Sequence, residues 1–220
     1  MTSTSKNAIQ RLLAAIGPAC DVYQNRVLRN LPCKKIQYDE IWSFCYAEQK
    51  NVPADEQGRF GFGDVWTWTA LCADTKLIRS SKIGTRGASS AYAPMHDFAD
   101  RLSCRIQLTT AGDRVYADAV ENVFGSAIDY SMLVKIYGAD REESEARCSP
   151  AECMGCRSIP MAGNPKPQYI STSYVEHQNL TMRMQMRRFI RLTNAFSRKI
   201  DNLGFAVAMH FIHYNFCRAH

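Results

Sequence analysis

The 220-residue chain lacks the long apolar runs of a membrane protein. No apolar stretch approaches the roughly 20 residues that a spanning helix needs. The N-terminus, MTSTSKNAIQRLLAAIG, also lacks the uninterrupted apolar core of a signal peptide. The nine cysteines are odd in number and scattered through apolar segments, which indicates reduced thiols in a cytosol. We therefore expect a soluble cytoplasmic protein with no membrane partner.

Several common catalytic motifs are missing as well. The chain has no glycine-rich phosphate loop of the GxxxxGK type and no Ser or Cys motif for acyl transfer. Internal repeats and low-complexity segments are absent. The composition, 46% hydrophobic and 22% charged, is that of one ordinary globular domain.

Positive charge is concentrated in one segment, although the net charge is only +6. Between Tyr174 and Lys199 the only acid is Glu176, against six basic residues: Arg183, Arg187, Arg188, Arg191, Arg198 and Lys199. The pattern predicts one helix over residues 173–200, with a row of arginines within about 60° of Glu176. That row is Arg183, Arg187, Arg191 and Arg198. Such a face is either a solvated charged surface or one that follows a phosphate backbone.

The rest of the chain alternates between strand and helix patterns. Aromatic and β-branched residues predict a strand at 34–48 and two more at 61–84, joined by a turn near Asp74. Further along, helical spacing and short apolar runs predict a helix at 88–102, a strand at 104–110, a helix at 113–125 and a strand at 131–138. This order predicts an α/β fold with a mixed five-stranded sheet flanked by helices.

Three segments lie outside this alternation. Residues 4–30 predict two helical pieces divided by a Gly17-Pro18 stop, and residues 203–217 predict a last helix. Residues 139–172 hold four of the eight prolines and little periodicity, which predicts an irregular insertion.

Two acids stand out by position. Asp39 lies in the middle of a strand, where a buried carboxylate is costly unless it is paired or bound to a metal. The alternative is a surface acid on a strand edge. Glu176 heads the basic helix, where Ser173-x-x-Glu176 matches a capping box, although a carboxylate there can also hold a divalent metal. A two-metal site needs acids that converge from different elements.

Two other groups resemble metal ligands. Cys148, Cys153 and Cys156 have close spacing, but structural zinc sites usually take four ligands, so free thiols are the favoured interpretation. His210 and His213 lie among apolar residues and are expected to be packed or hydrogen-bonded.

Several long motifs occur in one order along nearly the whole chain: DEIWSF, GDVWTWTALCADTKL, QLTT-x-G, Y-x-x-AVENVFG, TSYVEHQNLTMRMQMRRFIRLTNAFSRK and AVAMHFIHYNFCRAH. Together they closely resemble transposases of the insertion-sequence-one type. The resemblance implies a ribonuclease-H-like fold and DDE chemistry, in which two Asp and one Glu hold two Mg²⁺ (or Mn²⁺) ions. These ions activate water and then a DNA 3′-hydroxyl to attack phosphodiesters.

The resemblance assigns roles to residues of this chain. Asp39 is implied to be the first acid and Glu176 the third, and Arg183 matches a basic position typical of such enzymes. With Arg187, Arg191 and Arg198, Arg183 is implied to hold double-stranded DNA, both element ends and target. A homodimer or higher assembly on DNA, in a nucleoid-associated protein, is implied as well.

The chain departs from the family pattern at the second acid. The family has Thr-Thr-Asp-Gly after the fourth strand, whereas this chain has Ala111 between Thr110 and Gly112. Alanine offers no metal ligand, so we expect impaired catalysis. Asp113 is displaced by about 6–7 Å along a strand and stands in only if a turn brings it back. The alternative is a catalytically inactive, transposase-derived DNA-binding protein.

The same resemblance divides the chain. Residues 1–30 are expected to be the helical remnant of an N-terminal helix-turn-helix DNA-binding segment. Residues 31–220 are expected to be the ribonuclease-H-like transposase domain, with the insertion at 139–172. Relative to the family, the chain is expected to be short at both ends.

Overall fold

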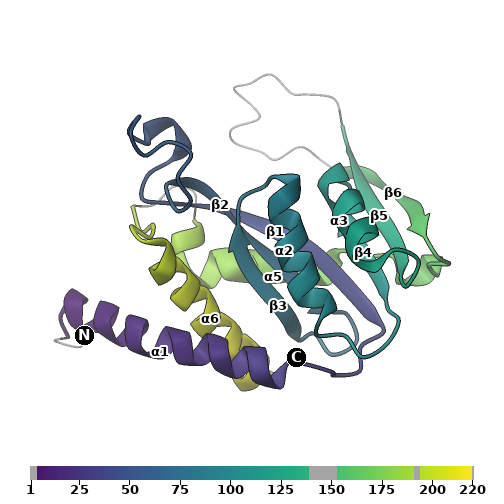
Figure 1. Cartoon of the computed structure of the whole chain (residues 1–220), viewed down its shortest axis with the longest axis horizontal. Helices are drawn as coiled ribbons and strands as arrows, with labels where there is room; N and C mark the ends of the chain where they lie inside the picture. Colours follow the sequence, from purple (N-terminus) through teal and green to yellow (C-terminus); the bar gives the residue numbers. More distant parts are fainter. Residues whose placement is uncertain (1–3, 139–152, 191–193, 220) are drawn as a thin grey trace.

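The computed structural model describes residues 4–138, 153–190 and 194–219. They form one mixed sheet with helices packed against it (Figure 1). The sheet has the order β3-β2-β1-β4-β5-β6. β1 pairs antiparallel with β2 and parallel with β4, and β4 pairs parallel with β5. The α/β class and the three successive strands predicted between residues 34 and 84 are thus confirmed. The strands are β1 (Lys35–Cys45), β2 (Gly63–Cys72), β3 (Ile78–Gly84), β4 (Gln107–Ala111), β5 (Asp129–Tyr137) and β6 (Cys153–Ala162).

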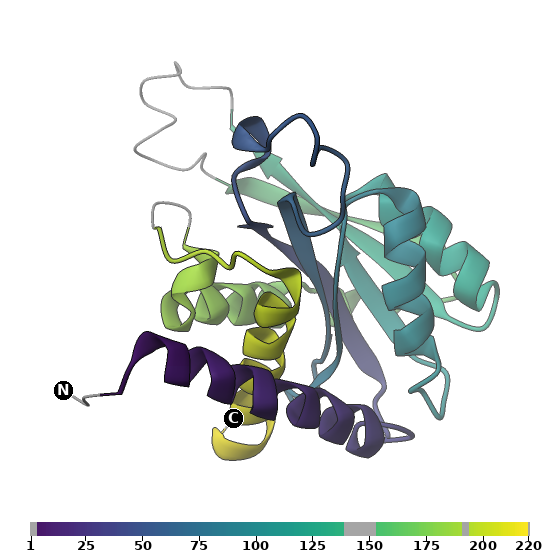
Figure 2. The ribbon, with the colours of Figure 1, turned by 60° about the vertical axis from the view of Figure 1, so that its left-hand side comes forward.

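Helices cover both faces of the sheet. Figure 2 shows α2 and α3 on one face, α5 and α6 on the other, and α1 outside α6. One buried cluster, including Met95, Phe98 and Tyr116, lies under α2 and α3, and a second, including Met182 and Phe211, lies under α5 and α6. The elements are α1 (Lys6–Val27), α2 (Ala88–Ala99), α3 (Arg114–Phe124), α5 (Ser173–Gln185), α6 (Ile200–Cys217) and the 3₁₀ turns η1 (Gln49–Asn51), η2 (Pro167–Tyr169) and η3 (Arg187–Phe189).

The sheet has one strand more than the five predicted. β6 lies within residues 139–172 and pairs antiparallel with β5, so the prediction of an irregular insertion was wrong for this part. Residues 139–152 lie outside the described residues. Most side chains of β6 are exposed, so the strand lacks the apolar alternation of a half-buried strand. It also contains Pro160, a residue that sheets tolerate on their edges.

Helix α1 runs without interruption through Gly17-Pro18, so the predicted stop was wrong. The reason is a close contact between α1 and α6. A Cβ atom at Gly17 would lie 2.2 Å from Phe205 Cβ and 2.8 Å from Phe205 Cα. The missing side chain lets the two helix backbones approach closely, and this packing outweighs the local cost of Pro18.

Replacing Gly17 by alanine tests this contact. Alanine favours a helix by about 1 kcal/mol over glycine, but overpacking of a close contact typically costs 1–3 kcal/mol. We expect Gly17→Ala to lower the free energy of unfolding by up to about 2 kcal/mol in urea titrations. Gly155→Ala is the matched control, since no atom lies within 4 Å of a Cβ there. A Gly17→Ala protein more stable than its parent would contradict the close crossing.

Helix α5 ends at Gln185 rather than continuing to residue 200, so the predicted long helix was wrong. The chain turns extended at Met186 and then forms η3, which places Phe189 in the second core at 2% exposure. A continuous helix would also stack arginines at i and i+4, which is destabilising. Core packing of Phe189 and charge repulsion therefore both favour the early end of α5.

The last helix is confirmed and begins slightly earlier than predicted, at Ile200.

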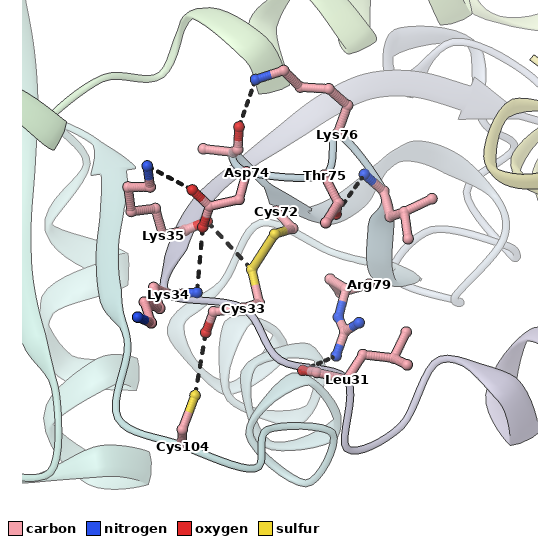
Figure 3. Close-up of a disulfide and its surroundings, with 12 residues drawn as sticks. Leu31, Cys33, Lys34, Lys35, Cys72, Asp74, Thr75, Lys76, Arg79 and Cys104 are labelled. Atoms are coloured by element: carbon pink, nitrogen blue, oxygen red, sulfur yellow. Dashed lines mark hydrogen bonds and ion pairs between the residues drawn. A yellow bond between two sulfur atoms is a disulfide. The ribbon is translucent and has the colours of Figure 1, made fainter. Parts of the chain in front are cut away.

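A disulfide joins Cys33, just before β1, to Cys72 at the end of β2 (Figure 3). The expectation of reduced thiols is therefore wrong for this pair. Nearby, Lys35 forms an ion pair with Asp74 at 2.5 Å, and the Cys104 thiol donates to the Cys33 carbonyl at 3.4 Å.

Among the described residues, no helix is long and apolar enough to cross a membrane.

Candidate active site

A pocket of about 960 Å³ lies where β1, the end of β4, β5 and α5 meet. It brings together Asp39 from β1, Ala111 from β4 and Glu176 from α5. The other lining residues that matter below are Glu40, Arg86, Asp113, Lys135, Asn179 and Arg183. The three positions of the expected acidic triad therefore surround one pocket, although they come from three separate elements.

The sheet register makes Asp39 and Ala111 point the same way. Tyr38 pairs with Thr110 in the parallel β1–β4 ladder, and Asp39 and Ala111 each follow by one residue. Since side chains alternate along a strand, those of residues 39 and 111 share one face of the sheet. Helix α5 covers this face, and Asn179 Nδ2 donates to Asp39 Oδ2 at 2.9 Å. A carboxylate at position 111 would therefore point toward the pair formed by Asp39 and Glu176.

Asp39 is a partly buried acid in the interior of the sheet. β1 lies between β2 and β4, so the reading of Asp39 as a strand-edge surface acid was wrong. Burial, followed by the negative charge of Glu40 and a smaller effect of Glu176, raises the pKa of Asp39 to about 7. Among the described residues no Lys or Arg forms an ion pair with Asp39. The carboxyl group thus lies in an environment that a cation would stabilise.

Glu176 stands in the first turn of α5 with both carboxylate oxygens engaged. Lys135 Nζ donates to Oε2 at 2.5 Å, and Thr172 Oγ1 donates to Oε1 at 2.6 Å. The capping-box interpretation is therefore wrong, because the Glu176 side chain bonds these two groups rather than a backbone N–H. Burial is the largest single influence on the pKa of Lys135 and lowers it, but the hydrogen bond to Glu176 and nearby negative charges, above all that of Glu176, together outweigh burial and raise the pKa.

Asp113 lines the pocket but has structural partners. Its Oδ1 accepts from the Val115 N–H at 3.1 Å and caps α3, while its Oδ2 accepts from Arg86 Nη2 at 2.9 Å. Arg86 also approaches Glu40 at 3.7 Å. Burial raises the pKa of Glu40, and the charge of Arg86 acts in the opposite direction. To act as the second acid, Asp113 would have to release both the helix cap and the arginine.

Sequence reasoning did not single out Lys135, Glu40 or Arg86. Lys135 lies in the apolar segment SMLVKIYG, and Glu40 directly follows Asp39 in a strand. The argument applied to Asp39, that a charge in a buried strand needs a partner, identifies Lys135 and Glu40 as well. Arg86 follows β3 in a short connection and carries no comparable local signal.

The four arginines assigned to DNA do not form one helical row, so that prediction was wrong. Arg183 lies on α5 and lines the pocket. Arg187 is exposed in η3, and Arg198 is exposed just before α6, next to the Ser197 bridge to Cys45. Arg191 lies outside the described residues. Only Arg183 of these residues is thus placed at the pocket.

The other candidate metal ligands are not gathered around this pocket. Cys153 and Cys156 are exposed on β6, and Cys148 lies outside the described residues. His210 is buried next to Gln178, as expected, and burial lowers its pKa to about 4. Cys33, Cys72 and Asp74 lie within 4.8 Å of one another, but both sulfurs are in the disulfide and Asp74 is paired with Lys35.

No protein-family model matches the chain, and no curated protein matches it either.

The raised pKa of Asp39 predicts a pH-dependent effect of Asp39→Asn. Between about pH 4, the ordinary value for Asp, and pH 7 the folded state holds a proton that the unfolded state has released. Stability due to this proton is present at low pH and lost as the pH rises to 7. In EDTA-containing buffer we expect Asp39→Asn to be more stable than its parent by roughly 2–4 kcal/mol at pH 8 and by far less at pH 4.5.

Urea unfolding at both pH values measures this difference. Asp118→Asn provides the matched control, because Asp118 is exposed on α3 and away from the pocket. A stability gain of Asp39→Asn that stays constant between pH 4.5 and pH 8 would contradict a perturbed Asp39.

Proposed function

We propose that this chain is a DNA transposase of the insertion-element class, built on a ribonuclease-H-like domain and impaired at its second catalytic acid. One observation carries the proposal: Asp39, position 111 and Glu176 come from three elements and converge on one pocket. Such convergence is what a metal-dependent phosphoryl-transfer site needs. The mixed sheet, with three antiparallel strands followed by parallel β4 and β5, is compatible with that fold.

The residues of the pocket fit one divalent ion better than two. Asp39 is a partly buried carboxyl with no ion pair among the described residues, and Glu176 faces the same pocket. Ala111 offers only a methyl group where the resemblance places a third ligand. Mg²⁺ or Mn²⁺, held by Asp39 and Glu176, supplies Lewis-acid stabilisation and an activated water when bound. Within the chain itself, Asn179 orients Asp39, and Arg183 is positioned to bind a DNA phosphate at the pocket.

Restoring the missing acid tests the catalytic part of the proposal. Because residue 111 points to the same face as Asp39, Ala111→Asp places a third carboxylate at the pocket. We expect the parent to show negligible Mg²⁺- or Mn²⁺-dependent nicking of plasmid DNA, and Ala111→Asp to exceed it by roughly a hundredfold, since a second metal adds several kcal/mol of stabilisation. Ala111→Asn, which has the same shape without the charge, is the matched control.

Two results would overturn this assignment. Robust nicking by the parent that disappears in Asp113→Ala would make Asp113 the second acid. Nicking by Ala111→Asp that persists after Glu176→Gln would remove Glu176 from the site.

The second candidate function is a transposase-derived DNA-binding protein without activity. Three observations favour it, because each leaves a metal ion with one carboxylate fewer. Ala111 has no carboxylate, Glu176 is paired with Lys135, and Asp113 caps a helix. DNA binding by the Ala111→Asp protein without any nicking is the result that selects this candidate.

DNA binding itself is tested by its salt dependence. Each phosphate contact contributes about 0.9 to the slope of log affinity against log salt. We expect the double substitution Arg183→Gln with Arg187→Gln to weaken binding to duplex DNA and to reduce the slope by about 2. The matched control removes two exposed cations elsewhere, Lys50 and Arg59, in the same way. Equal slopes for parent and double variant, measured by fluorescence anisotropy, would show that these arginines do not contact phosphates.

A further inference from the structure

The pocket contains one ammonium group directly on the expected third acid. We propose that Lys135 is an internal counter-cation that takes the place of a divalent ion at Glu176 and thereby limits the metal affinity of the pocket. This inference rests on the proposed function, because it concerns the same pair of carboxylates.

The strand register directs Lys135 to the pocket. Ala111 pairs with Leu133 in the β4–β5 ladder, and Lys135 lies two residues further along β5. Since alternate residues share a face, Lys135 points to the same side as Ala111 and Asp39, the side that α5 covers. Its Nζ lies 2.5 Å from Glu176 Oε2, and about one third of each side chain remains exposed. The contact is thus built by the sheet geometry rather than by a chance surface encounter.

This ion pair leaves the charges of the pocket unevenly distributed. Glu176 has an ammonium on one oxygen and the Thr172 hydroxyl on the other. Asp39 accepts hydrogen bonds from the Asn179 amide and the Glu40 backbone N–H, and it faces the unfavourable charges of Glu40 and Glu176. Among the described residues, the Lys135 ammonium therefore neutralises Glu176, and Asp39 is left without an ion pair.

A divalent ion and the Lys135 ammonium compete for the same oxygen. Mg²⁺ binds carboxylate oxygens at about 2.0–2.1 Å and needs a free lone pair. Two cations held within about 4 Å of each other repel strongly in a partly buried site. A metal bound by Asp39 and Glu176 must therefore displace Lys135 from Glu176, and the lost ion pair reduces the apparent metal affinity. Lys135 is a positioning residue in this scheme: it holds Glu176 in the metal-free state.

Direct Mn²⁺ binding tests the proposal without any measurement of catalysis. Free Mn²⁺ is followed by its electron paramagnetic resonance signal during titration of the parent, Lys135→Met and Lys50→Met. We expect Lys135→Met to bind Mn²⁺ on the order of tenfold more tightly than the parent, an estimate that allows for solvent screening of this partly exposed pair. Lys50→Met removes an equal charge from an exposed site and should leave the affinity unchanged.

A stability measurement separates this role from a purely structural one. Without metal, Lys135→Met should unfold at a lower temperature than the parent, because Glu176 then lacks its cation. Added Mn²⁺ should raise the unfolding temperature of Lys135→Met more than that of the parent, since the ion restores the missing charge. Equal shifts for both proteins would contradict the proposal.

The same titrations in the Ala111→Asp background complete the design, with Lys135→Gln as a second variant if the methionine protein folds poorly. The proposal is overturned if removal of the ammonium leaves Mn²⁺ affinity unchanged in both backgrounds while Glu176→Gln still weakens binding. In that case the acidic site stands and only the role of Lys135 falls. Mn²⁺ binding that is insensitive to both Asp39→Asn and Glu176→Gln would instead overturn the proposed function, and this inference with it.

Discussion

The side-chain amide of Gln37 fixes the geometry on which the pocket depends. Its Oε1 accepts the backbone N–H groups of Tyr174 and Val175 at 2.8 and 3.0 Å. These N–H groups belong to the first turn of α5 and have no partner within the helix. Gln37 is two residues before Asp39 on the same face of β1, and Glu176 directly follows Val175. One buried cap from the sheet therefore sets the spacing between the two carboxylates.

The pocket separates its charges between the two faces of the sheet. Because Asp39 and Glu40 are consecutive, their side chains point to opposite faces. Glu40 approaches Arg86, which also binds Asp113 at the start of α3. On the α5 side Lys135 binds Glu176 rather than Asp39. Among the described residues that line the pocket, Asp39 is thus the carboxylate whose charge depends most on what enters from solution.

Local sequence patterns were sufficient for the elements whose apolar residues are dense or regular enough to mark a strand or a helix. β1 to β5, α2, α3 and α6 follow this rule, and their order gave the α/β class. Sequence patterns failed where distant packing decides the outcome. The Gly17-Pro18 pair was misread because its partner, Phe205, lies in the last helix. The end of α5 depends on Phe189 entering the second core, and β6 is too exposed to show a period.

The candidate site shows the same division. Asp39 was found because a carboxylate in a buried strand needs a partner, and Glu176 because it heads a basic segment. The long shared motifs then pointed to position 111. The structure brings all three to one pocket. The partners of these residues were not readable, because contacts such as Lys135 with Glu176 or Gln37 with the start of α5 join residues far apart in the chain. Their formation depends on strand register and helix docking, which local periodicity does not specify.

The disulfide between Cys33 and Cys72 makes the stability of the folded domain depend on the redox conditions around it. The two cysteines are separated by 39 residues, and closing a loop of that length stabilises a folded chain by roughly 4 kcal/mol in the chain-entropy description. Reduction would release this constraint in the unfolded chain. The hydrogen bonds that Gln37 and Asn179 make to α5 and Asp39 do not involve either sulfur. A reducing compartment would therefore lower the free energy of unfolding of the domain while leaving the arrangement of its carboxylates intact.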